Sequence, residues 1–512
     1  MTHGGMRLAD VAREVPGDVS VPGGASEILV TGVHHDSRAV GPGDLFVARR
    51  GASADGAGFA TDAVRRGAVA IVAAQGAALP PLAVPVVRVD DPQRALAYAA
   101  AAVYGHPSFA LDVVGVTGTN GKTTTTHLVR AALDGALGRP SCGTLGTVGH
   151  GFAGALVEAT HTTPEADEVA RVLAWMRTRG ASTVAMEVSS HALAQGRVEA
   201  VRFRVAAFTN LTQDHLDFHG SFAAYGDAKA RLFTELGPGA AVVNVDDPFG
   251  AELAERVTCP LLRVRRTPGA DADVAPTTLD LGPQGVQMRA RTPFGEVEVR
   301  SRLLGLHNVE NLLVALAIAL ALDVDPADAA RALGEEGGAP GRLERCDEDA
   351  DDVRVLVDYA HTPDALARAL DSLAPFRVGR VICVFGCGGD RDPTKRAPMG
   401  SAAGRGADLA VVTSDNPRGE APEAIAEAVE VGVRAAGLTR IALSELAEAP
   451  RGYVVVLDRR EAIAAAVHAA RPGDIVLICG KGHENYQIVG AVRHGLDDRV
   501  EARRALAARR GT

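Results

Sequence analysis

The fold is decided at Val113-Val114-Gly115-Val116-Thr117-Gly118-Thr119-Asn120-Gly121-Lys122-Thr123-Thr124-Thr125-Thr126, residues 113–126. An apolar run typical of a buried strand leads directly into a glycine-punctuated turn and then into a hydroxyl-rich helix start. Such a turn lets backbone N–H groups converge on an anion, and the helix points the positive end of its dipole at the same place. The stretch therefore predicts a phosphate-binding loop.

Each residue type in this loop suits a bound nucleotide. The predicted nucleotide contacts are Gly118, Thr119, Asn120, Gly121, Lys122, Thr123 and Thr124. Lys122 supplies a mobile positive charge, and the Thr123 hydroxyl suits Mg2+. The first glycine of the general phosphate-loop pattern would fall at Val116, so a narrower variant of the motif is indicated. The strand before the turn and the helix pattern after it disfavour a chance glycine turn, and we expect the ligand to be ATP.

Composition excludes several classes of protein. At 512 residues the chain is long enough for about three domains, and 47% hydrophobic with 23% charged residues is globular composition. A net charge of -10 and only 4% aromatic residues argue against nucleic acid binding. Six scattered cysteines, a polar N-terminus and no apolar run of about 20 residues predict a cytoplasmic protein without membrane insertion. Cys383 and Cys387 fit core packing better than metal ligation.

The alternation of apolar runs and turns predicts an α/β fold with three domains. Residues 1–109 indicate a small α/β domain. Residues 110–340 alternate strands and helices, with runs at 111–116, 183–188, 205–211 and 240–245, and so predict a mostly parallel sheet with a hairpin at 286–299. After a Gly/Pro-rich joint, residues 341–512 predict a Rossmann-like, doubly wound sheet with strands at 353–357, 381–385, 409–413, 453–457 and 475–478.

Polar clusters follow several predicted strands of the central domain. Glu187 and His215 come after neighbouring strands, and ligands gather at the carboxyl ends of strands in open α/β sheets. Both could face the phosphates, whereas an isolated His215 would equally suit a surface position. Lys229 lies in a predicted helix and, by itself, is typical of a solvated helix lysine.

Further clusters lie near and beyond the inter-domain joint. Asn308 opens an apolar helix and could cap that helix or hydrogen-bond a planar base. Arg342 follows the joint and Asp358 ends a strand, so these two could close on ATP from the last domain. In the last domain, guanidinium, carboxylate and amide groups follow successive strands and together suit an amino acid with both charges. The residues in question are Arg391, Asp415, Asn416, Pro417, Arg418, Gly480 and Glu484.

Ten motifs in one order make the chain resemble the Mur ligases from end to end. They are GTNGKTT, EVSSH, TNLTQDHLDFH, YGDAKARLF, HNVEN, GRLE, DYAHTPDAL, FGCGGDRD, DNPR and GKGHE. The resemblance implies an ATP-dependent amide ligase that acts on UDP-MurNAc-L-Ala-D-Glu through an acyl phosphate in peptidoglycan precursor synthesis. DNPR at residues 415–418 is the version associated with diaminopimelate, because the distal end of that substrate needs Arg418. The resemblance also implies a monomer with a part in cell shape and division.

The resemblance lends roles to matching residues. It implies that residues 1–109 hold the UDP part with Ser37 as a contact, and that Lys229 carries a carbamate derived from CO2. The catalytic residues would be Lys122, Lys229, His215 and Glu187, and the metal ligands Thr123, Glu187, His215 and Lys229. The sugar and peptide would contact Thr162, Thr163, Ser189, Gln195 and Arg197. His161 receives no role, because some family members have asparagine there.

Two alternatives differ in ways that the sequence can test. Folylpolyglutamate synthetase is similar to Mur ligases in its ATP domain but lacks a UDP-type N-terminal domain and the DNPR loop. A non-catalytic nucleotide-binding or scaffold protein descended from such a ligase would be expected to have lost Lys122, Lys229 or His215, and all three are present.

Overall fold

A computed structural model describes residues 5–51, 54–159, 161–282 and 284–511. The chain forms two compact units. Unit 1 comprises residues 1–277, 290–297 and 310–333, and unit 2 comprises residues 278–289, 298–309 and 334–512. No helix in the described ranges is long and apolar enough to cross a bilayer.

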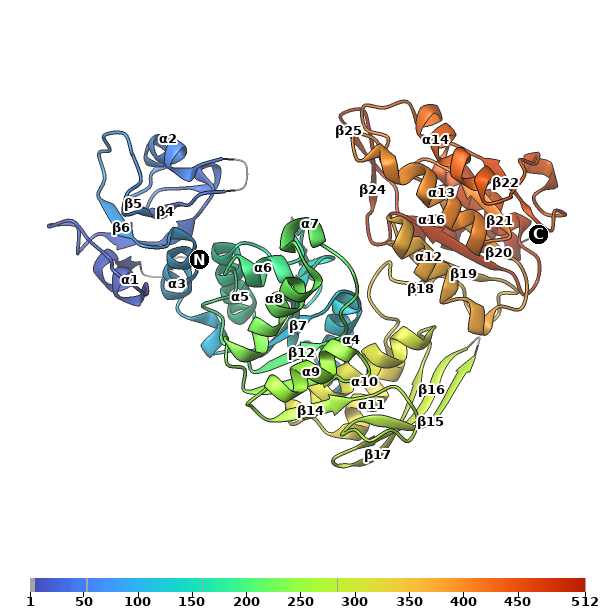
Figure 1. Ribbon diagram of the computed structural model, residues 1–512, viewed down its shortest axis with the longest axis horizontal. Helices are drawn as coiled ribbons and strands as arrows, with labels where there is room; N and C mark the ends of the chain where they lie inside the picture. Colours follow the sequence, from blue (N-terminus) through green and yellow to red (C-terminus); the bar gives the residue numbers. More distant parts are fainter. Residues whose placement is uncertain (1–4, 52–53, 160, 283, 512) are drawn as a thin grey trace. The chain divides into compact units, whose positions relative to one another are not determined.

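Unit 1 begins with a small parallel sheet in the order β3-β4-β5-β6 (Figure 1). Its strands are β3 Gly32–His34, β4 Asp44–Ala48, β5 Ala70–Ala74 and β6 Val86–Val89, and a separate pair joins β1 Met6–Arg7 to β2 Leu29–Val30. Alternation places Leu45 and Val47 on the face covered by α1 Leu8–Glu14 and α3 Pro92–Val103. Phe46 and Ile71 pack on the other face against α2 Ala60–Arg66. The small α/β module expected here is confirmed.

The central sheet has the order β10-β9-β8-β11-β7-β12-β13-β14. Its strands are β7 Asp112–Thr117, β8 Cys142–Gly146, β9 Gly149–Phe152, β10 Ala155–Val157, β11 Thr183–Glu187, β12 Val205–Phe208, β13 Ala240–Asn244 and β14 Leu261–Val264. The four predicted strands are present and parallel. Sequence analysis missed β8, β9, β10 and β14, because these short runs carry several glycines or little apolar contrast with their flanks.

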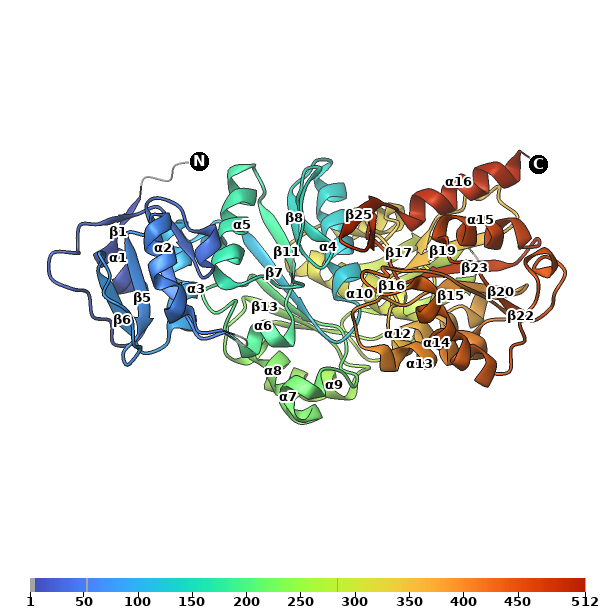
Figure 2. The same cartoon turned by 90° about the horizontal axis from the view of Figure 1, so that it is seen from above.

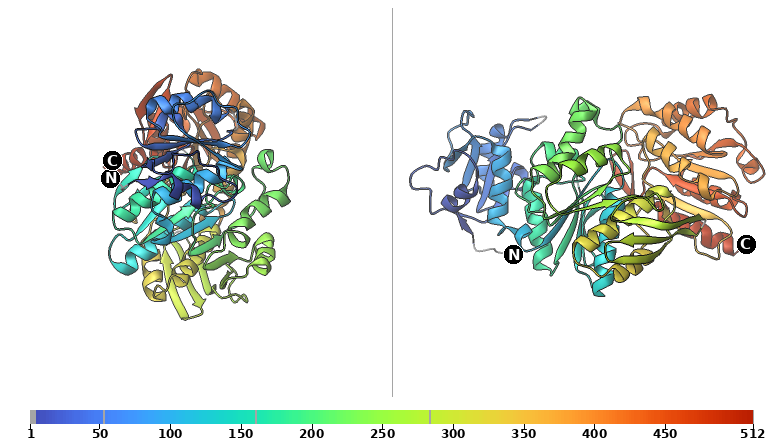
Figure 3. Two further views of the ribbon diagram at one scale, coloured as in Figure 1. Left: turned by 90° about the vertical axis from the view of Figure 1, so that its left-hand side faces the viewer. Right: turned by 60° about the horizontal axis from the view of Figure 1, so that its bottom comes forward.

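Helices cover both faces of the central sheet. They are α4 Lys122–Leu137, α5 Ala166–Thr178, α6 Ser190–Ala194, α7 Leu216–His219, α8 Phe222–Thr234 and α9 Pro248–Arg256. Figure 3 shows the green helices along one side of the central strands, and the buried residues of α5, α6, α8 and α9 share one core with that face. Strand β7 lies between β11 and β12, so the loops that follow these two strands lie on opposite sides of the carboxyl end of β7. Ligands bind at such switch points.

A three-stranded sheet in the order β15-β16-β17 and two helices follow. Their bounds are β15 Ala275–Gly282, β16 Gly285–Thr292, β17 Gly295–Ser301, α10 Leu306–Ala321 and α11 Pro326–Glu335. The predicted hairpin corresponds to β16 and β17. Strand β15 was missed because its sequence, APTTLDLG, has few large apolar residues, which agrees with the small number of buried positions in the strand.

Unit 2 contains a six-stranded sheet in the order β18-β19-β23-β20-β21-β22. Its strands are β18 Glu344–Arg345, β19 Arg354–Asp358, β20 Val381–Phe385, β21 Leu409–Val412, β22 Gly452–Val455 and β23 Ile475–Cys479, with a separate pair β24 Tyr486–Val489 and β25 Val492–Gly495. All five predicted strands are present and parallel. Strand β18, which is antiparallel to β19, and the β24–β25 pair were not predicted.

Two groups of helices sandwich this sheet, as Figure 2 shows. They are α12 Pro363–Asp371, α13 Arg396–Gly406 and α14 Pro422–Ala435 on one face, and α15 Arg459–Ala469 and α16 Asp498–Arg510 on the other. The predicted doubly wound architecture is therefore confirmed. Cys383 and Cys387 are both buried in the first of these cores, as expected.

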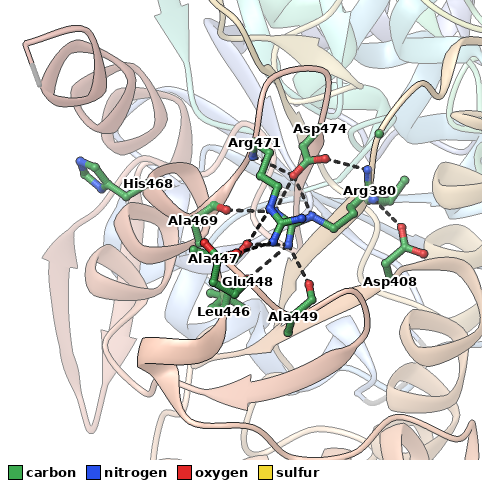
Figure 4. A network of polar contacts seen from close by, with 12 residues as sticks. Arg380, Asp408, Leu446, Ala447, Glu448, Ala449, His468, Ala469, Arg471 and Asp474 are labelled. Atoms are coloured by element: carbon green, nitrogen blue, oxygen red, sulfur yellow. Dashed lines mark hydrogen bonds and ion pairs between the residues drawn. The ribbon is translucent and has the colours of Figure 1, made fainter.

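Arg380 makes hydrogen bonds at the amino ends of β20 and β23 in unit 2 (Figure 4). Its guanidinium donates to Asp474 Oδ2 at 2.7 and 3.0 Å, and its backbone N–H donates to Asp474 Oδ1 at 2.7 Å. The same guanidinium donates to the carbonyls of Ala447, Ala449 and Ala469 at 3.0, 2.7 and 3.0 Å. Asp474 is 3% exposed, so this ion pair is shielded from water. Without Arg380, the Asp474 carboxylate would lose its cationic partner in a buried position.

Replacing Arg380 with Met should destabilise the chain by about 3 kcal/mol or more, because a buried carboxylate and several carbonyls would lose their donor. Urea unfolding of the full chain, followed by circular dichroism, measures the loss. Arg377→Met is the matched control, since the neighbouring Arg377–Asp408 pair is 41% and 24% exposed and should contribute about 1 kcal/mol or less. Equal effects of the two variants would contradict the role given to Arg380.

Candidate active site

The phosphate loop is shaped by two glycines and held by the next strand. Gly118 and Gly121 adopt φ values of 148° and 84°, which favour glycine. The Thr209 hydroxyl donates to Asn120 O at 2.6 Å, and Asn120 N–H donates to Asn210 Oδ1 at 2.9 Å. These residues follow β12, so the parallel neighbour of β7 fixes the loop. The conformation agrees with the sequence prediction.

Two lysines donate to one carbonyl of this loop. Lys122 Nζ and Lys229 Nζ each lie 2.8 Å from Gly118 O, and Lys122 also reaches Thr119 O at 2.9 Å. Lys229 is only 1% exposed and makes no ion pair within the described ranges. Burial, and secondarily the charge of Lys122, keep the pKa of Lys229 well below the ordinary lysine value. The exposed helix lysine suggested by the sequence alone is therefore wrong.

An oxygen-rich group lies at the start of α4. The Thr123 hydroxyl donates to Glu187 Oε2 at 2.9 Å, and Thr147 N–H donates to Glu187 Oε1 at 2.7 Å. Glu187 is 1% exposed and reaches the loop from the end of β11, while Thr124 is buried in the first turn of α4. Carboxylate and hydroxyl oxygens are the ligands that Mg2+ prefers, so Thr123 and Glu187 fit this ion.

His215 is exposed and its ring lies in a cluster with those of His191 and His219. Its backbone has φ 52°, and its ring packs edge-on against His191 at a centroid distance of 4.7 Å. His219 bonds to the Ser190 hydroxyl at 3.0 Å, and its ring lies 5.2 Å from that of Tyr225. In the described part of the chain, no three His, Cys, Asp or Glu side chains are grouped closely enough to hold a metal by themselves.

The residues expected to meet the sugar and peptide adjoin Glu187. Thr163 donates to Glu187 O at 2.8 Å and accepts from Ser189 N–H at 3.0 Å. Arg197 donates to Thr163 O at 2.9 Å and to Gln195 Oε1 at 2.6 Å. The hydroxyls of Thr162 and Thr147 lie 3.1 Å apart. These predicted substrate contacts are therefore brought together beside the phosphate loop.

Ser37 lines a separate cavity of about 540 Å3 in the N-terminal module. The cavity also includes His35, Arg38, Arg49, Phe59 and Asp62. Ser37 begins a turn capped by Asp36, and its hydroxyl donates to Asp62 Oδ2 at 3.2 Å. The size and polar lining suit a small polar ligand.

In unit 2, Arg342 and Asp358 lie at one end of the sheet. Asp358 accepts from the N–H groups of Leu343 and Ala360, both at 2.8 Å, and so fixes the turns that flank it. The Arg342 guanidinium lies 4.9 Å from the centroid of the Tyr359 ring, and His483 lies 5.0 Å from the same ring. Asn308, in the first turn of α10, donates to Leu304 O at 2.9 Å.

The loops after β21 and β23 meet around a lysine that sequence analysis missed. Lys481 Nζ lies 3.4 Å from Asp415 Oδ1, 3.2 Å from Asn416 Oδ1 and 3.1 Å from Glu484 Oε2. Lys481 is fully buried, whereas both carboxylates remain partly exposed. The cation thus gathers three predicted substrate residues. Its sequence signal was weak, since a lysine between two loop glycines is typical of an exposed position.

The remaining predicted residues of unit 2 flank this lysine. Arg418 donates to Gly389 O at 2.8 Å with φ 53°, Pro417 is buried, and Arg391 is exposed. Gly480 has φ 121°. Arg459 and Asp498 form a fully buried ion pair at 2.6 Å, and Arg459 also donates to Ser414 O and Cys479 O, just before the two loops. This pair was also missed, because it joins residues distant in sequence.

Three known domains match successive segments of the chain. They are the "Mur ligase family, catalytic domain" at residues 29–104, the "Mur ligase middle domain" at 116–319 and the "Mur ligase, glutamate ligase domain" at 341–482. The matched segments correspond in order to the four-stranded, eight-stranded and six-stranded sheets, and they contain the predicted phosphate loop and the loops around Lys481.

Full-length relatives carry one name. The chain is 45% identical over 512 residues to the UDP-N-acetylmuramoyl-L-alanyl-D-glutamate–2,6-diaminopimelate ligase of Geobacter metallireducens, covering 98% of each chain. It is 43% identical to that of Streptomyces coelicolor, covering 98% of this chain and 97% of the relative. A solved structure with this name has TM-score 0.69 at 33% identity, covering 100% of both chains. A Mycobacterium tuberculosis folylpolyglutamate synthase shares the fold, with TM-score 0.56 at 21% identity over 75% of this chain and 91% of that one.

The stability of unit 2 should fall as the pH drops from about 6.5 to about 4. Burial, with the nearby guanidinium groups of Arg342 and Arg499, lowers the pKa of His483 to about 4. The unfolded chain therefore takes up this proton at higher pH than the folded chain, which costs on the order of 2–3 kcal/mol by pH 4. Unfolding midpoints measured across this range for His483→Gln should vary less with pH. The exposed His468→Gln is the control, and a wild-type pH dependence in His483→Gln would refute the assignment.

Proposed function

The chain belongs to the Mur ligase family, and we propose that it joins diaminopimelate to UDP-MurNAc-L-Ala-D-Glu at the expense of ATP. The observation that carries the proposal is the assembly of Asp415, Asn416 and Glu484 around Lys481, directly after parallel strands. Relatives of known name match this chain over nearly its whole length, including both of these loops.

The reaction would proceed in two displacements. The D-glutamyl γ-carboxylate attacks the γ-phosphorus of ATP, releasing ADP and giving an acyl phosphate. The amine of diaminopimelate then attacks the acyl carbon, and phosphate leaves from the tetrahedral intermediate as the amine loses its proton. Lys122 and the loop N–H groups offset the charge that develops during phosphoryl transfer. Thr123 and Glu187 would hold Mg2+, which neutralises phosphate charge when bound, and His215 is a further proposed ligand.

Lys229 has the surroundings that a carbamate requires. Its amine is buried, lies beside a second cation and has no carboxylate partner in the described ranges. Such surroundings favour the neutral amine, whose lone pair forms the N–C bond with CO2 while a proton is released. The resulting anion would place a negative charge beside the Lys122 ammonium group and could ligate a metal ion.

Further residues are proposed for each ligand. For ATP they are Gly118, Thr119, Asn120, Gly121, Thr124, Asn308, Arg342 and Asp358. For the UDP substrate they are Ser37, Thr162, Thr163, Ser189, Gln195 and Arg197, and for diaminopimelate Arg391, Pro417, Arg418 and Gly480. Guanidinium groups bind carboxylates and carboxylates bind ammonium groups, so together they suit an amino acid with two zwitterionic ends. A cytoplasmic monomer that serves cell-wall growth, cell shape and division fits this assignment.

Replacing Lys122 with Ala should abolish turnover, because the loop would lose the ammonium group that offsets the charge on the phosphates during phosphoryl transfer. Phosphate release with UDP-MurNAc-L-Ala-D-Glu, ATP and an amino-acid panel tests both function and specificity. Wild-type release should require diaminopimelate, and lysine should not substitute for it. An active Lys122→Ala variant would refute the assignment of the loop. Phosphate release with lysine in place of diaminopimelate would refute the specificity for diaminopimelate.

Incubation with 13C-labelled bicarbonate should give a carbamate carbon signal that Lys229→Met lacks. Because the pKa of Lys229 is lowered, the reactive neutral amine persists below the pH at which an exposed lysine protonates. The signal should therefore persist to lower pH than that of an exposed lysine, and disappear as the pH falls through the lowered pKa. Lys395→Met, at a partly exposed lysine in unit 2, is the control and should keep the signal.

A further inference from the structure

Glu165 holds two arginines on one carboxylate oxygen. Its Oε1 lies 3.0 Å from Arg49 Nη2 and 3.1 Å from Arg197 Nη2. The three side chains are only 10%, 19% and 11% exposed, respectively, so the contacts are largely screened from water. An ion pair in such surroundings is stronger than a surface pair and costs more when one partner is lost.

The two arginines lead to two parts of the proposed substrate site. Arg49 belongs to the cavity that Ser37 lines in the N-terminal module. Arg197 donates to Thr163 O and Gln195 Oε1 in the central module. Glu165 follows Thr163 by two residues and lies at the N-cap of α5. One carboxylate therefore connects the UDP cavity with the residues that adjoin Glu187.

This cluster carries an excess of positive charge. Two guanidinium groups face one carboxylate, and Glu165 Oε2, Arg49 Nε and Arg197 Nε have no hydrogen-bond partner among the described residues. Burial lowers the pKa of Arg197, which reports the cost of keeping this charge out of water. An anionic ligand that reached the cluster would offset that cost. UDP-MurNAc-L-Ala-D-Glu brings such groups, with a diphosphate and carboxylates.

We propose that Glu165 and Arg49 are positioning residues for the UDP-sugar peptide. Glu165 holds Arg197 in place beside Thr163, and through the same carboxylate it holds Arg49 in place in the cavity that Ser37 lines. The inference rests on the proposed function and extends it to two residues outside the motifs. It assigns neither residue to the chemistry of ATP or diaminopimelate.

Other contacts hold the two modules together without Glu165. His35 bonds to Asp167 at 2.8 Å, and Ala166, Ala170 and Ala174 of α5 share a core with α3 (Figures 1 and 2). Arg94 and Glu199 form a more exposed ion pair, at 3.3 Å, between the same modules. The chain should therefore fold when Glu165 becomes Gln, and Arg94→Met provides a matched control outside the cavity.

Calorimetry of the full chain measures the affinity for UDP-MurNAc-L-Ala-D-Glu directly. Glu165→Gln should raise the Kd about tenfold, because hydrogen bonds to a charged partner are weakened. Arg49→Met should raise it about threefold, and the double variant should be no weaker than Glu165→Gln, because the two residues act through one contact. In turnover assays, the KM for the UDP substrate should rise while the KM values for ATP and diaminopimelate stay within about twofold.

Three outcomes would overturn the inference: an unchanged Kd in Glu165→Gln, additive effects in the double variant, or an equal loss in Arg94→Met. Equal unfolding midpoints of the variants would confirm that folding is intact. Because the Kd is measured without turnover, this test differs from that of the proposed function. A wild-type chain that binds the UDP substrate but forms no product would refute only the proposed reaction.

Discussion

The candidate site depends on the backbone conformation of residues 118–121, the predicted phosphate loop. The loop does not hold itself: Thr119 N–H and Asn120 N–H donate to Asn210, and the Thr209 hydroxyl donates to Asn120 O. These contacts come from the end of β12, the parallel neighbour of β7. Since both strands end at the same edge, the sheet itself sets the position of the predicted phosphate loop.

Charge imbalance is the second constraint, and it recurs in both units. Lys122 and Lys229 share one carbonyl, and Arg49 and Arg197 share one carboxylate oxygen. Around Lys481 the imbalance is opposite, since one buried cation faces two carboxylates. The clusters of unit 1 therefore suit anionic ligands, whereas the cluster of unit 2 suits an ammonium group. This division matches the order in which the proposed reaction uses nucleotide, acid and amine.

In the six-stranded sheet of unit 2, the residues that stabilise the fold and the predicted ligand residues lie at opposite ends of the strands. In unit 2, Arg380 and Asp474 bind the amino ends of the strands, while the predicted ligand residues follow their carboxyl ends. The buried Arg459–Asp498 pair connects these roles, because Arg459 donates to the carbonyls of Ser414 and Cys479, which precede the loops after β21 and β23. Substitutions at the two ends of one strand should thus have different consequences, for folding at one and for binding at the other.

The sequence by itself determined the strands β7, β11, β12 and β13, the doubly wound C-terminal sheet and the phosphate loop, because apolar periodicity and glycine turns are local properties. The ordered motifs likewise identified the family. Only the tertiary structure decided that Lys229 is buried, that Lys481 gathers Asp415 and Glu484, and that Glu165 joins Arg49 to Arg197. Burial and pairing of a charge depend on groups far away in the chain, and no local pattern records which of them will meet.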